Sequence, residues 1–279
     1  MVDPRVRKYL RLLEPIPSGY PSGGCLVGPI QAVLFDIYGT LFISACGDIS
    51  VEEANFSTAS SLEALLGEFR IGVSPTDLTR SLHQKIQDEH QRKRMAGIEW
   101  PEVDIVSVWQ TILDWPDTDR VRAFALAYEW AVNPCYPMPG LDQVLRLLRD
   151  RGLSLGLVSN AQFYTPLLFE WFLGAPSETL QFEQDLTVYS YCYGEAKPSK
   201  TLFNRCSAKL SVKGIAPASV VYVGNDMRND ILPASEMAWQ TVLFAGDRRS
   251  LRLRRGHSGC RHLHPDLVIT DLRELLSWI

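Results

Sequence analysis

Short apolar runs alternate with amphipathic segments along the second half of this chain of 279 residues. Strands buried on both faces of a sheet are typically short runs rich in Val, Leu and Ile, and the helices between them allow parallel crossovers. The alternation therefore predicts an α/β fold, with a parallel sheet covered by helices on both faces. The predicted strands are Ala32–Phe35, Leu153–Ser159, Leu186–Cys192, Val220–Gly224, Thr241–Phe244 and Leu267–Thr270, with predicted helices that include Lys200–Leu210 and Asn229–Met237.

The stretch 46–136 lacks this alternation and is predicted to be entirely helical. Prolines stand near the junctions between its segments, where they suit a first helical turn. We expect an all-α cap at 46–136, inserted into an α/β core of residues 30–45 plus 137–279. Residues 1–29 are rich in Pro and Gly and are expected to form a short leading helix and an irregular N-terminal arm. The predicted cap helices are Val51–Arg70, Pro75–Ala96, Glu102–Trp115 and Asp117–Asn133.

The charge and composition exclude several classes of partner. The formal net charge is −4 and the pI is about 5.8, so a general attraction to nucleic acid or to anionic lipid is not expected. No apolar run approaches the roughly 20 residues of a membrane-spanning helix, and the N-terminus lacks the apolar core of a secretory signal. The six cysteines are far apart, which fits reduced thiols. We expect a cytoplasmic protein with a small-molecule partner; the sequence does not indicate its oligomeric state.

Polar side chains follow the predicted strands at the points where the strands end. In a parallel α/β sheet, ligands bind beyond the carboxyl ends of the strands. A nucleophilic carboxylate, a hydroxyl, an ammonium group and an acidic pair are thus expected to converge on one crevice. They are Asp36 after the first strand, Ser159 and Asn160 after the second, Lys197 after the third, and Asn225, Asp226, Asn229 and Asp230 after the fourth.

This ordered set resembles the motifs of the haloacid dehalogenase (HAD) superfamily. The four matching segments are Asp36-Ile37-Tyr38-Gly39-Thr40, Ser159-Asn160, Lys197-Pro198 and Gly224-Asn225-Asp226 with Asp230. The resemblance covers almost all of the chain outside the N-terminal arm, and the predicted cap is similar to the helical caps of one subgroup. It implies a Rossmann-like core and a hydrolase with an inserted cap.

The resemblance also implies a role for each residue. Asp36 is the expected nucleophile, which would form a covalent aspartyl intermediate. Ser159 would donate a hydrogen bond, and Lys197 would neutralise charge that develops during transfer. Mg²⁺ would offset the charge of a phosphoryl group. Its expected ligands are Asp36, the backbone carbonyl of Tyr38 and Asp226, with Asp230 orienting them directly or through water; Thr40, Asn160 and Tyr38 are the expected substrate-binding residues.

Tyr38 and the acidic loop favour different reactions. HAD phosphatases usually carry a second aspartate two residues after the nucleophile, and a phenol with a pKa of about 10 is a poor general acid at neutral pH. Tyr38 therefore resembles the 2-haloacid dehalogenases, which need no metal, whereas Asp226 and Asp230 resemble the phosphatases. We expect a Mg²⁺-dependent phosphatase of a small phosphorylated metabolite. A metal-independent dehalogenase-like hydrolase, or a catalytically weak HAD-like binding protein, is the alternative.

Two further polar segments carry weaker indications. The polar stripe on the predicted helix Pro75–Ala96 is expected to face solvent or, alternatively, to face Asp36 and select the substrate. An arginine-rich segment at 248–255 is expected to be a solvated basic loop, or else to bind an anion. The stripe consists of Arg80, His83, Gln87, His90 and Arg94, and the arginines stand at positions 248, 249, 252, 254 and 255.

Overall fold

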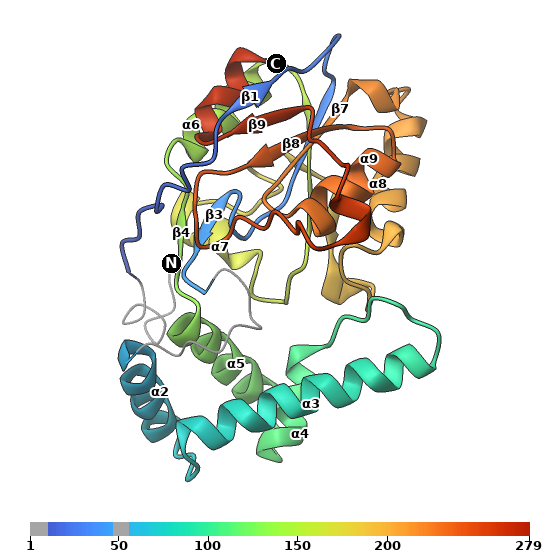
Figure 1. Cartoon of the computed structure of the whole chain (residues 1–279). Coiled ribbons are helices and arrows are strands. Elements are labelled where there is room, and N and C mark those ends of the chain that lie inside the picture. Colours follow the sequence, from blue (N-terminus) through green and yellow to red (C-terminus); the bar gives the residue numbers. More distant parts are fainter. Residues whose placement is uncertain (1–10, 47–55) are drawn as a thin grey trace.

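The structure is a computed structural model that describes residues 11–46 and 56–279. A seven-stranded sheet forms the centre of its α/β part (Figure 1). Its strand order is β1-β9-β8-β7-β2-β5-β6, and every neighbouring pair is parallel except β1 with β9. The predicted α/β fold with a parallel sheet is confirmed. The strands are β1 (Gly23–Gly24), β2 (Ala32–Phe35), β5 (Ser154–Ser159), β6 (Phe182–Tyr189), β7 (Val220–Gly224), β8 (Gln240–Phe244) and β9 (Leu267–Ile269).

Both faces of the sheet are buried because helices cover each of them. Alternate residues of β2 belong to two hydrophobic clusters: Val33 and Phe35 pack on one side, and Ala32 and Leu34 on the other. This is the period of two that a strand imposes on its side chains. The first cluster includes residues of α6 (Leu141–Asp150), α7 (Leu167–Leu173) and the 3₁₀ helix η5 (Leu272–Ser277); the second includes residues of α8 (Lys200–Val212) and α9 (Leu232–Glu236).

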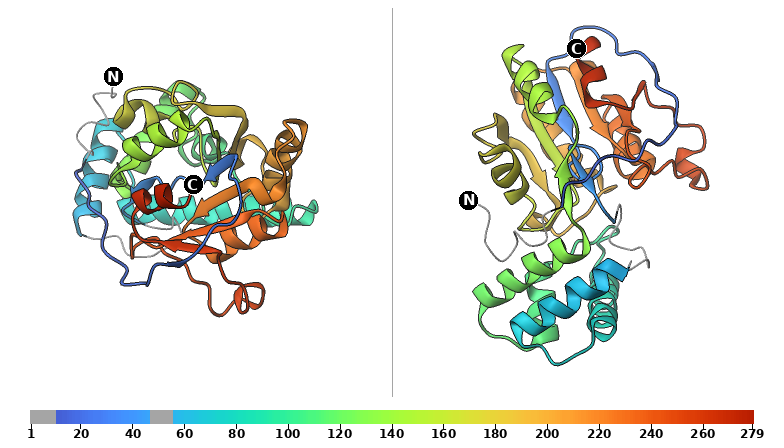
Figure 2. Two further views of the ribbon diagram at one scale, coloured as in Figure 1. Left: turned by 90° about the horizontal axis from the view of Figure 1, so that it is seen from above. Right: turned by 90° about the vertical axis from the view of Figure 1, so that its left-hand side faces the viewer.

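Four helices form a bundle beyond one end of the sheet (Figures 1 and 2). Buried aromatic rings pack at its centre: the Trp109 ring lies 5.0 Å from that of Phe124 and 4.8 Å from that of Tyr128. Ser74, Asp104 and Asp117 cap the N-termini of the last three helices through their side chains. The helices are α2 (Phe56–Phe69), α3 (Pro75–Met95), α4 (Ile105–Leu113) and α5 (Thr118–Val132).

Two short antiparallel strands, β3 (Phe42–Ser44) and β4 (Cys135–Pro137), connect the bundle to the sheet. We propose that they mark the boundary between a core of residues 30–45 plus 137–279 and a cap of residues 46–136. None of the described helices combines the length and apolarity that crossing a bilayer requires.

Several expected boundaries were wrong. β6 begins at Phe182, four residues before the expected start. The three consecutive polar residues Glu183, Gln184 and Asp185 hid this part of the strand, which tolerates them because β6 lies at the edge of the sheet. The expected helix Asn229–Met237 is a π-helical turn, η3 (Met227–Ile231), followed by α9. The N-terminal arm is not wholly irregular, because it contains β1. Elsewhere in the chain, the elements β3, β4 and α7 were not expected. The leading helix and the predicted start of the first cap helix lie outside the described residues.

Candidate active site

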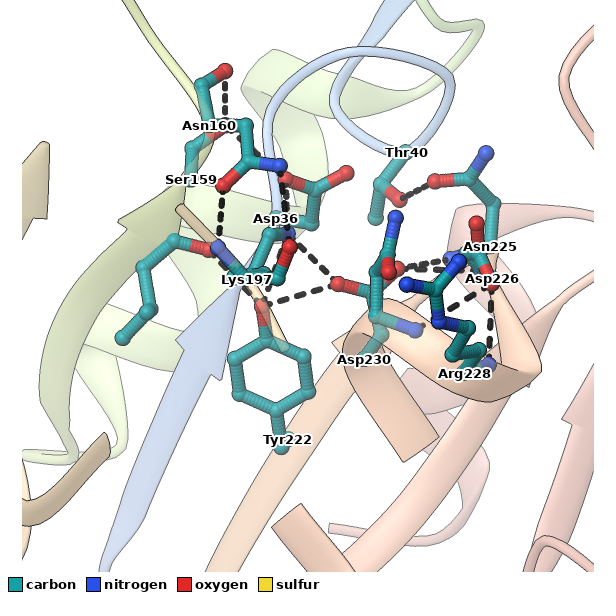
Figure 3. Close-up of polar contacts among 12 residues, drawn as sticks. Asp36, Thr40, Ser159, Asn160, Lys197, Tyr222, Asn225, Asp226, Arg228 and Asp230 are labelled. Carbon is teal, nitrogen blue, oxygen red and sulfur yellow. Dashed lines mark hydrogen bonds and ion pairs between the residues drawn. The ribbon is translucent and has the colours of Figure 1, made fainter. Parts of the chain in front are cut away.

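Three segments of the chain bring Asp36, Ser159 and Lys197 into contact at the carboxyl end of the sheet (Figure 3). Asp36 follows β2, and its Oδ1 accepts a hydrogen bond of 2.9 Å from Ser159 Oγ at the end of β5. The same oxygen lies 2.6 Å from Lys197 Nζ, in the loop after η1 (Ser190–Cys192). All three residues are buried, with at most 6% of each exposed. The three predicted catalytic residues therefore lie together.

Lys197 connects two carboxylates in the interior. Its Nζ lies 2.6 Å from Asp36 Oδ1 and 2.5 Å from Asp230 Oδ1, and it donates a longer bond of 3.3 Å to the hydroxyl of Tyr222. Burial by itself would lower the pKa of Lys197, but the charges of Asp230 and Asp36 outweigh burial and raise it above its ordinary value. Lys197 is therefore a fixed cation beside the carboxylate of Asp36.

Asp230 is committed to contacts within the protein. Its Oδ2 accepts the backbone N–H groups of Asn225 (3.1 Å) and Asp226 (3.0 Å), while Oδ1 binds Lys197. Burial raises the pKa of Asp230, the Lys197 ammonium opposes that rise, and the charges of Asp36 and Asp226 add to it. With both oxygens engaged, Asp230 acts on the site through the residues that it holds.

Asp226, a predicted metal ligand, forms an ion pair with Arg254. Arg254 Nε lies 3.1 Å from each carboxylate oxygen, and Nη2 lies 2.6 Å from Oδ2. Asp226 Oδ1 also accepts the backbone N–H groups of Arg228 (2.9 Å) and Asn229 (3.2 Å), which caps the π-helical turn η3. Arg254 therefore does not belong to a solvated loop, and that expectation was wrong for this residue.

The three predicted substrate-binding residues have different surroundings. Tyr38 lines the pocket, and its hydroxyl lies 2.9 Å from Thr165 Oγ1. Asn160 also lines the pocket and accepts the Lys197 backbone N–H at 2.6 Å through its Oδ1. Thr40 is fully buried and does not itself line the pocket, but it donates a hydrogen bond of 3.2 Å to Oδ1 of Asn225, which does.

Tyr38 is protected from ionisation at neutral pH. Burial, reinforced by the charges of Cys135 and Glu129, raises the pKa of the Tyr38 phenol well above its ordinary value. A neutral phenol with so high a pKa donates a hydrogen bond but gives up its proton with difficulty.

The pocket beside Asp36 has a volume of about 180 Å³ and extends to residues of the helical bundle. Two carboxyl groups line it in addition to those of Asp36, Asp226 and Asp230; they belong to Glu102 and Glu129. Glu129 accepts hydrogen bonds of 3.0 Å from Asn133 Nδ2 and from the hydroxyl of Tyr164. Its pKa is raised, above all by burial. None of the polar-stripe residues Arg80, His83, Gln87, His90 and Arg94 is among the residues that line the pocket.

Sequence reasoning missed Glu129, Tyr222 and Arg254 as parts of this site. A signal was present for two of them. Glu129 is a charged residue one position after Tyr128, on the apolar stripe of α5, and Tyr222 is the one polar-tipped residue in the buried run of β7. Buried carboxyl and phenol groups need hydrogen-bond partners, which places them at polar sites.

The oxygen atoms predicted to bind Mg²⁺ are only partly free to do so. Among the described residues, none donates a hydrogen bond to Asp36 Oδ2 or to the backbone carbonyl of Tyr38, so both hard oxygens remain available. Asp226 is different because Arg254 engages both of its oxygens. Within the described ranges, no three His, Cys, Asp or Glu side chains converge as a metal cluster, so a metal here would also need main-chain or water oxygens.

Comparison with known proteins agrees with this geometry. The family model of haloacid dehalogenase-like hydrolases matches residues 30–237. A probable phosphoglycolate phosphatase of Pseudomonas putida is 28% identical over 234 residues, which is 78% of each chain. A second phosphoglycolate phosphatase of the same species is 26% identical over 262 residues, covering 88% of this chain and 78% of that one.

Solved structures share the fold. A 2-haloacid dehalogenase from Pseudomonas syringae has a TM-score of 0.56 at 18% identity, over 89% of this chain and 97% of that one. A HAD phosphatase from Thermococcus onnurineus has a TM-score of 0.52 at 19% identity with the same coverage. At such identities the likeness concerns the fold alone, whereas the family model covers most of the chain. This protein belongs to the haloacid dehalogenase-like hydrolases.

Proposed function

We propose that this hydrolase is a Mg²⁺-dependent phosphatase that removes the phosphoryl group from a small phosphorylated metabolite. The observation that carries the proposal is the buried carboxylate of Asp36, held at Oδ1 by Ser159 and Lys197 while Oδ2 accepts no bond from a described residue. The relatives named phosphoglycolate phosphatase support a small phosphorylated substrate. A cytoplasmic location and a small-molecule partner remain predictions from the sequence.

The positions of the side chains support a reaction in two steps. An oxygen of Asp36 attacks phosphorus, the bond from phosphorus to the ester oxygen breaks, and the leaving group departs with its electron pair and then takes up a proton. Lys197 lies beside the nucleophile and stabilises the negative charge of the transferring group, and Ser159 keeps the carboxylate in one orientation. Water then attacks phosphorus of the phosphoaspartyl group and loses a proton to solvent. The bond between phosphorus and the Asp36 oxygen breaks, which releases phosphate and returns Asp36 as a carboxylate.

Asp36, the carbonyl of Tyr38 and Asp226 would hold Mg²⁺, and Asp230 would position the loop that carries Asp226. The bound ion would neutralise the charge of the phosphoryl group and orient it toward the nucleophile.

One observation favours a metal-independent dehalogenase as the second candidate. Tyr38 is a poor acid, and a halide leaves without a proton. A catalytically weak binding protein has less support, because the ion pairs that hold Asp36 and Lys197 are complete.

A substrate panel separates these functions. Phosphate monoesters, acyl phosphates and 2-haloacids would be tested with Mg²⁺ and with a chelator, with Asp36→Asn as the blank. We expect phosphate release that depends on Mg²⁺ and is absent in the variant. Halide release in the presence of chelator would replace this proposal with the dehalogenase, and a lack of turnover on the whole panel would favour the binding protein.

A further inference from the structure

The loop that follows β8 packs against two parts of the catalytic site. The backbone of Arg252 runs parallel to that of Asp226, in the acidic loop of residues 225–230. The Arg252 N–H donates to the carbonyl of Asn225, and the Arg252 carbonyl accepts from the N–H of Met227, both at 2.9 Å. Ser250 lies against the nucleophile loop: a Cβ on Gly39, whose φ is +80°, would lie 2.4 Å from Ser250 Cβ. Glycine at position 39 therefore permits both the turn and this close approach.

The base of this loop is anchored in the interior. The Asp247 side chain is fully buried and forms an ion pair with Arg249 at 2.8 Å. The backbone N–H groups of Ser250 and Leu251 also bond to the carbonyl of Asp247, at 3.2 and 3.0 Å. The backbone that leads to Arg254 is thus tied to the site at several points.

Arg254 itself adopts an unusual backbone conformation. Its φ is +48°, in the left-handed region that residues other than glycine and asparagine rarely enter. Strained backbone of this kind persists where surrounding contacts determine it and is concentrated at functional sites. Here the conformation accompanies the two-pronged ion pair between the guanidinium and Asp226, whose side chains are 29% and 9% exposed.

This ion pair occupies the carboxylate that a divalent cation would require. Mg²⁺ bonds to carboxylate oxygens at about 2.1 Å, and a guanidinium that donates to the same two oxygens excludes it sterically and by charge repulsion. Arg254 also lines the catalytic pocket, together with Arg252. The arginine-rich segment 248–255 was considered as an anion-binding loop. One of its arginines, Arg254, instead pairs with Asp226 of the protein itself.

We propose that Arg254 is a built-in competitor of Mg²⁺ at Asp226, so that metal binding requires the guanidinium to leave. The inference rests on the metal dependence stated under Proposed function. It adds that Arg254 sets the affinity of the site for Mg²⁺. When a binding-competent state is populated only in part, the apparent affinity falls by that fraction. If Arg254 is paired for about 90% of the time, its removal raises the affinity for Mg²⁺ about tenfold.

Calorimetry with Mg²⁺ alone tests this inference. Arg254→Met keeps an unbranched chain about as long as the stem of arginine and removes the guanidinium with its charge. Arg254→Lys keeps a charge without the two-pronged geometry. Arg255→Met is the matched control, because Arg255 is exposed and lies in the same loop. We expect Arg254→Met to bind Mg²⁺ about tenfold more tightly than the wild type. Arg254→Lys should be intermediate, Arg255→Met unchanged and Asp226→Ala weakest, with thermal melts confirming that each variant is folded.

Three results would overturn the proposal, and they are distinguishable. Equal affinity in the wild type and Arg254→Met would end the competition but leave the metal-dependent phosphatase intact. Weaker binding by Arg254→Met would show that Arg254 positions Asp226 for the metal. If neither the wild type nor Arg254→Met binds Mg²⁺, the proposed metal site does not exist. The metal dependence of the proposed function is then also wrong.

Discussion

In the proposed mechanism, the nucleophile Asp36 is held in place by its partners. Ser159 and Lys197 both contact Oδ1, so the carboxylate is oriented by protein groups before any substrate binds. Such preorganisation avoids reorganisation during the reaction, which is how fixed charges contribute to catalysis.

Replacement of Asp36 by Asn should abolish turnover and leave the fold intact. The amide has nearly the same shape but is a poor nucleophile, so we expect kcat to fall by roughly 10⁴-fold or more. Steady-state assays with the preferred substrate would measure the loss, and circular dichroism would check the fold. Asp185→Asn, which removes an exposed carboxylate that pairs with Lys209, is the control. Activity near that of the wild type in Asp36→Asn would end the covalent-aspartate mechanism.

Tyr38 should restrict the protein to substrates with good leaving groups. A general acid contributes 10²–10⁴-fold in typical cases, and its help matters most when the departing oxygen is basic. We predict that rates fall steeply as the leaving-group pKa rises across aryl and acyl phosphates. Tyr38→Asp should flatten this dependence by supplying a carboxyl group, whereas Tyr38→Phe should leave it steep.

Two outcomes would contradict this prediction about Tyr38. A folded Tyr38→Asp protein with an unchanged, steep dependence would show that position 38 does not control protonation. Rapid hydrolysis of simple alkyl phosphates by the wild type would indicate a proton donor elsewhere. Glu102 and Glu129 would then be tested first, because they line the pocket and His83 and His90 do not.

At the scale of elements, α5 brings a carboxyl group into the junction between cap and core. Glu129 lies near its C-terminal end and accepts a hydrogen bond from Tyr164, which follows β5. Asn133, one residue beyond the helix, donates to Glu129 and accepts from Ser44 Oγ in β3 at 2.8 Å. A single network therefore links a cap helix, a connecting strand and a loop of the core.

Glu129→Gln should change how stability depends on pH. The pKa of Glu129 is raised in the folded protein, chiefly by burial. Its contribution to the free energy of unfolding is therefore complete below the unfolded pKa of about 4.3 and is lost as pH rises through the folded pKa. The wild type is therefore penalised at higher pH and the amide is not. Urea unfolding at pH 5 and pH 7.5 should show the free energy of unfolding of Glu129→Gln rising relative to the wild type. Exposed Glu178 provides the control variant, Glu178→Gln; parallel pH profiles for the wild type and Glu129→Gln would refute the prediction.

At the scale of the whole molecule, cap and core share one hydrophobic cluster. Buried residues of the sheet, such as Phe35 and Val223, belong to the same connected set as Leu65 of α2 and Trp109 of α4. Contacts that continue from one unit to the other favour cooperative unfolding.

Trp109→Ala should therefore destabilise the entire protein. Trp109 is 1% exposed and packs against two aromatic rings, and truncation of a buried Trp costs about 3–5 kcal/mol. Far-ultraviolet circular dichroism and intrinsic fluorescence should show one shared transition at lower denaturant concentration. Exposed Trp278, changed to Ala, provides the comparison. Two separate transitions in Trp109→Ala would show that the cap unfolds independently.

The α/β alternation and the helical insertion were predictable from the sequence. The same holds for the order in which Asp36, Ser159, Lys197 and Asp230 follow the strands. These features depend on local periodicity and on residues that directly follow a strand, so a one-dimensional pattern contains them. Edge strands and junctions were less predictable: β3 and β4 are each three residues long, too short for a period to be recognised.

The contacts of the charged residues, in contrast, depend on how the chain folds in three dimensions. Arg254 lies 28 positions after Asp226, and Glu129 lies 35 positions before Tyr164, and neither pair follows a helical or strand period. Their contacts depend on how β8 and α5 pack against the rest of the molecule. A charge on a loop is solvated unless the fold places a partner beside it, and that placement is set by the packing of distant elements rather than by neighbours in sequence.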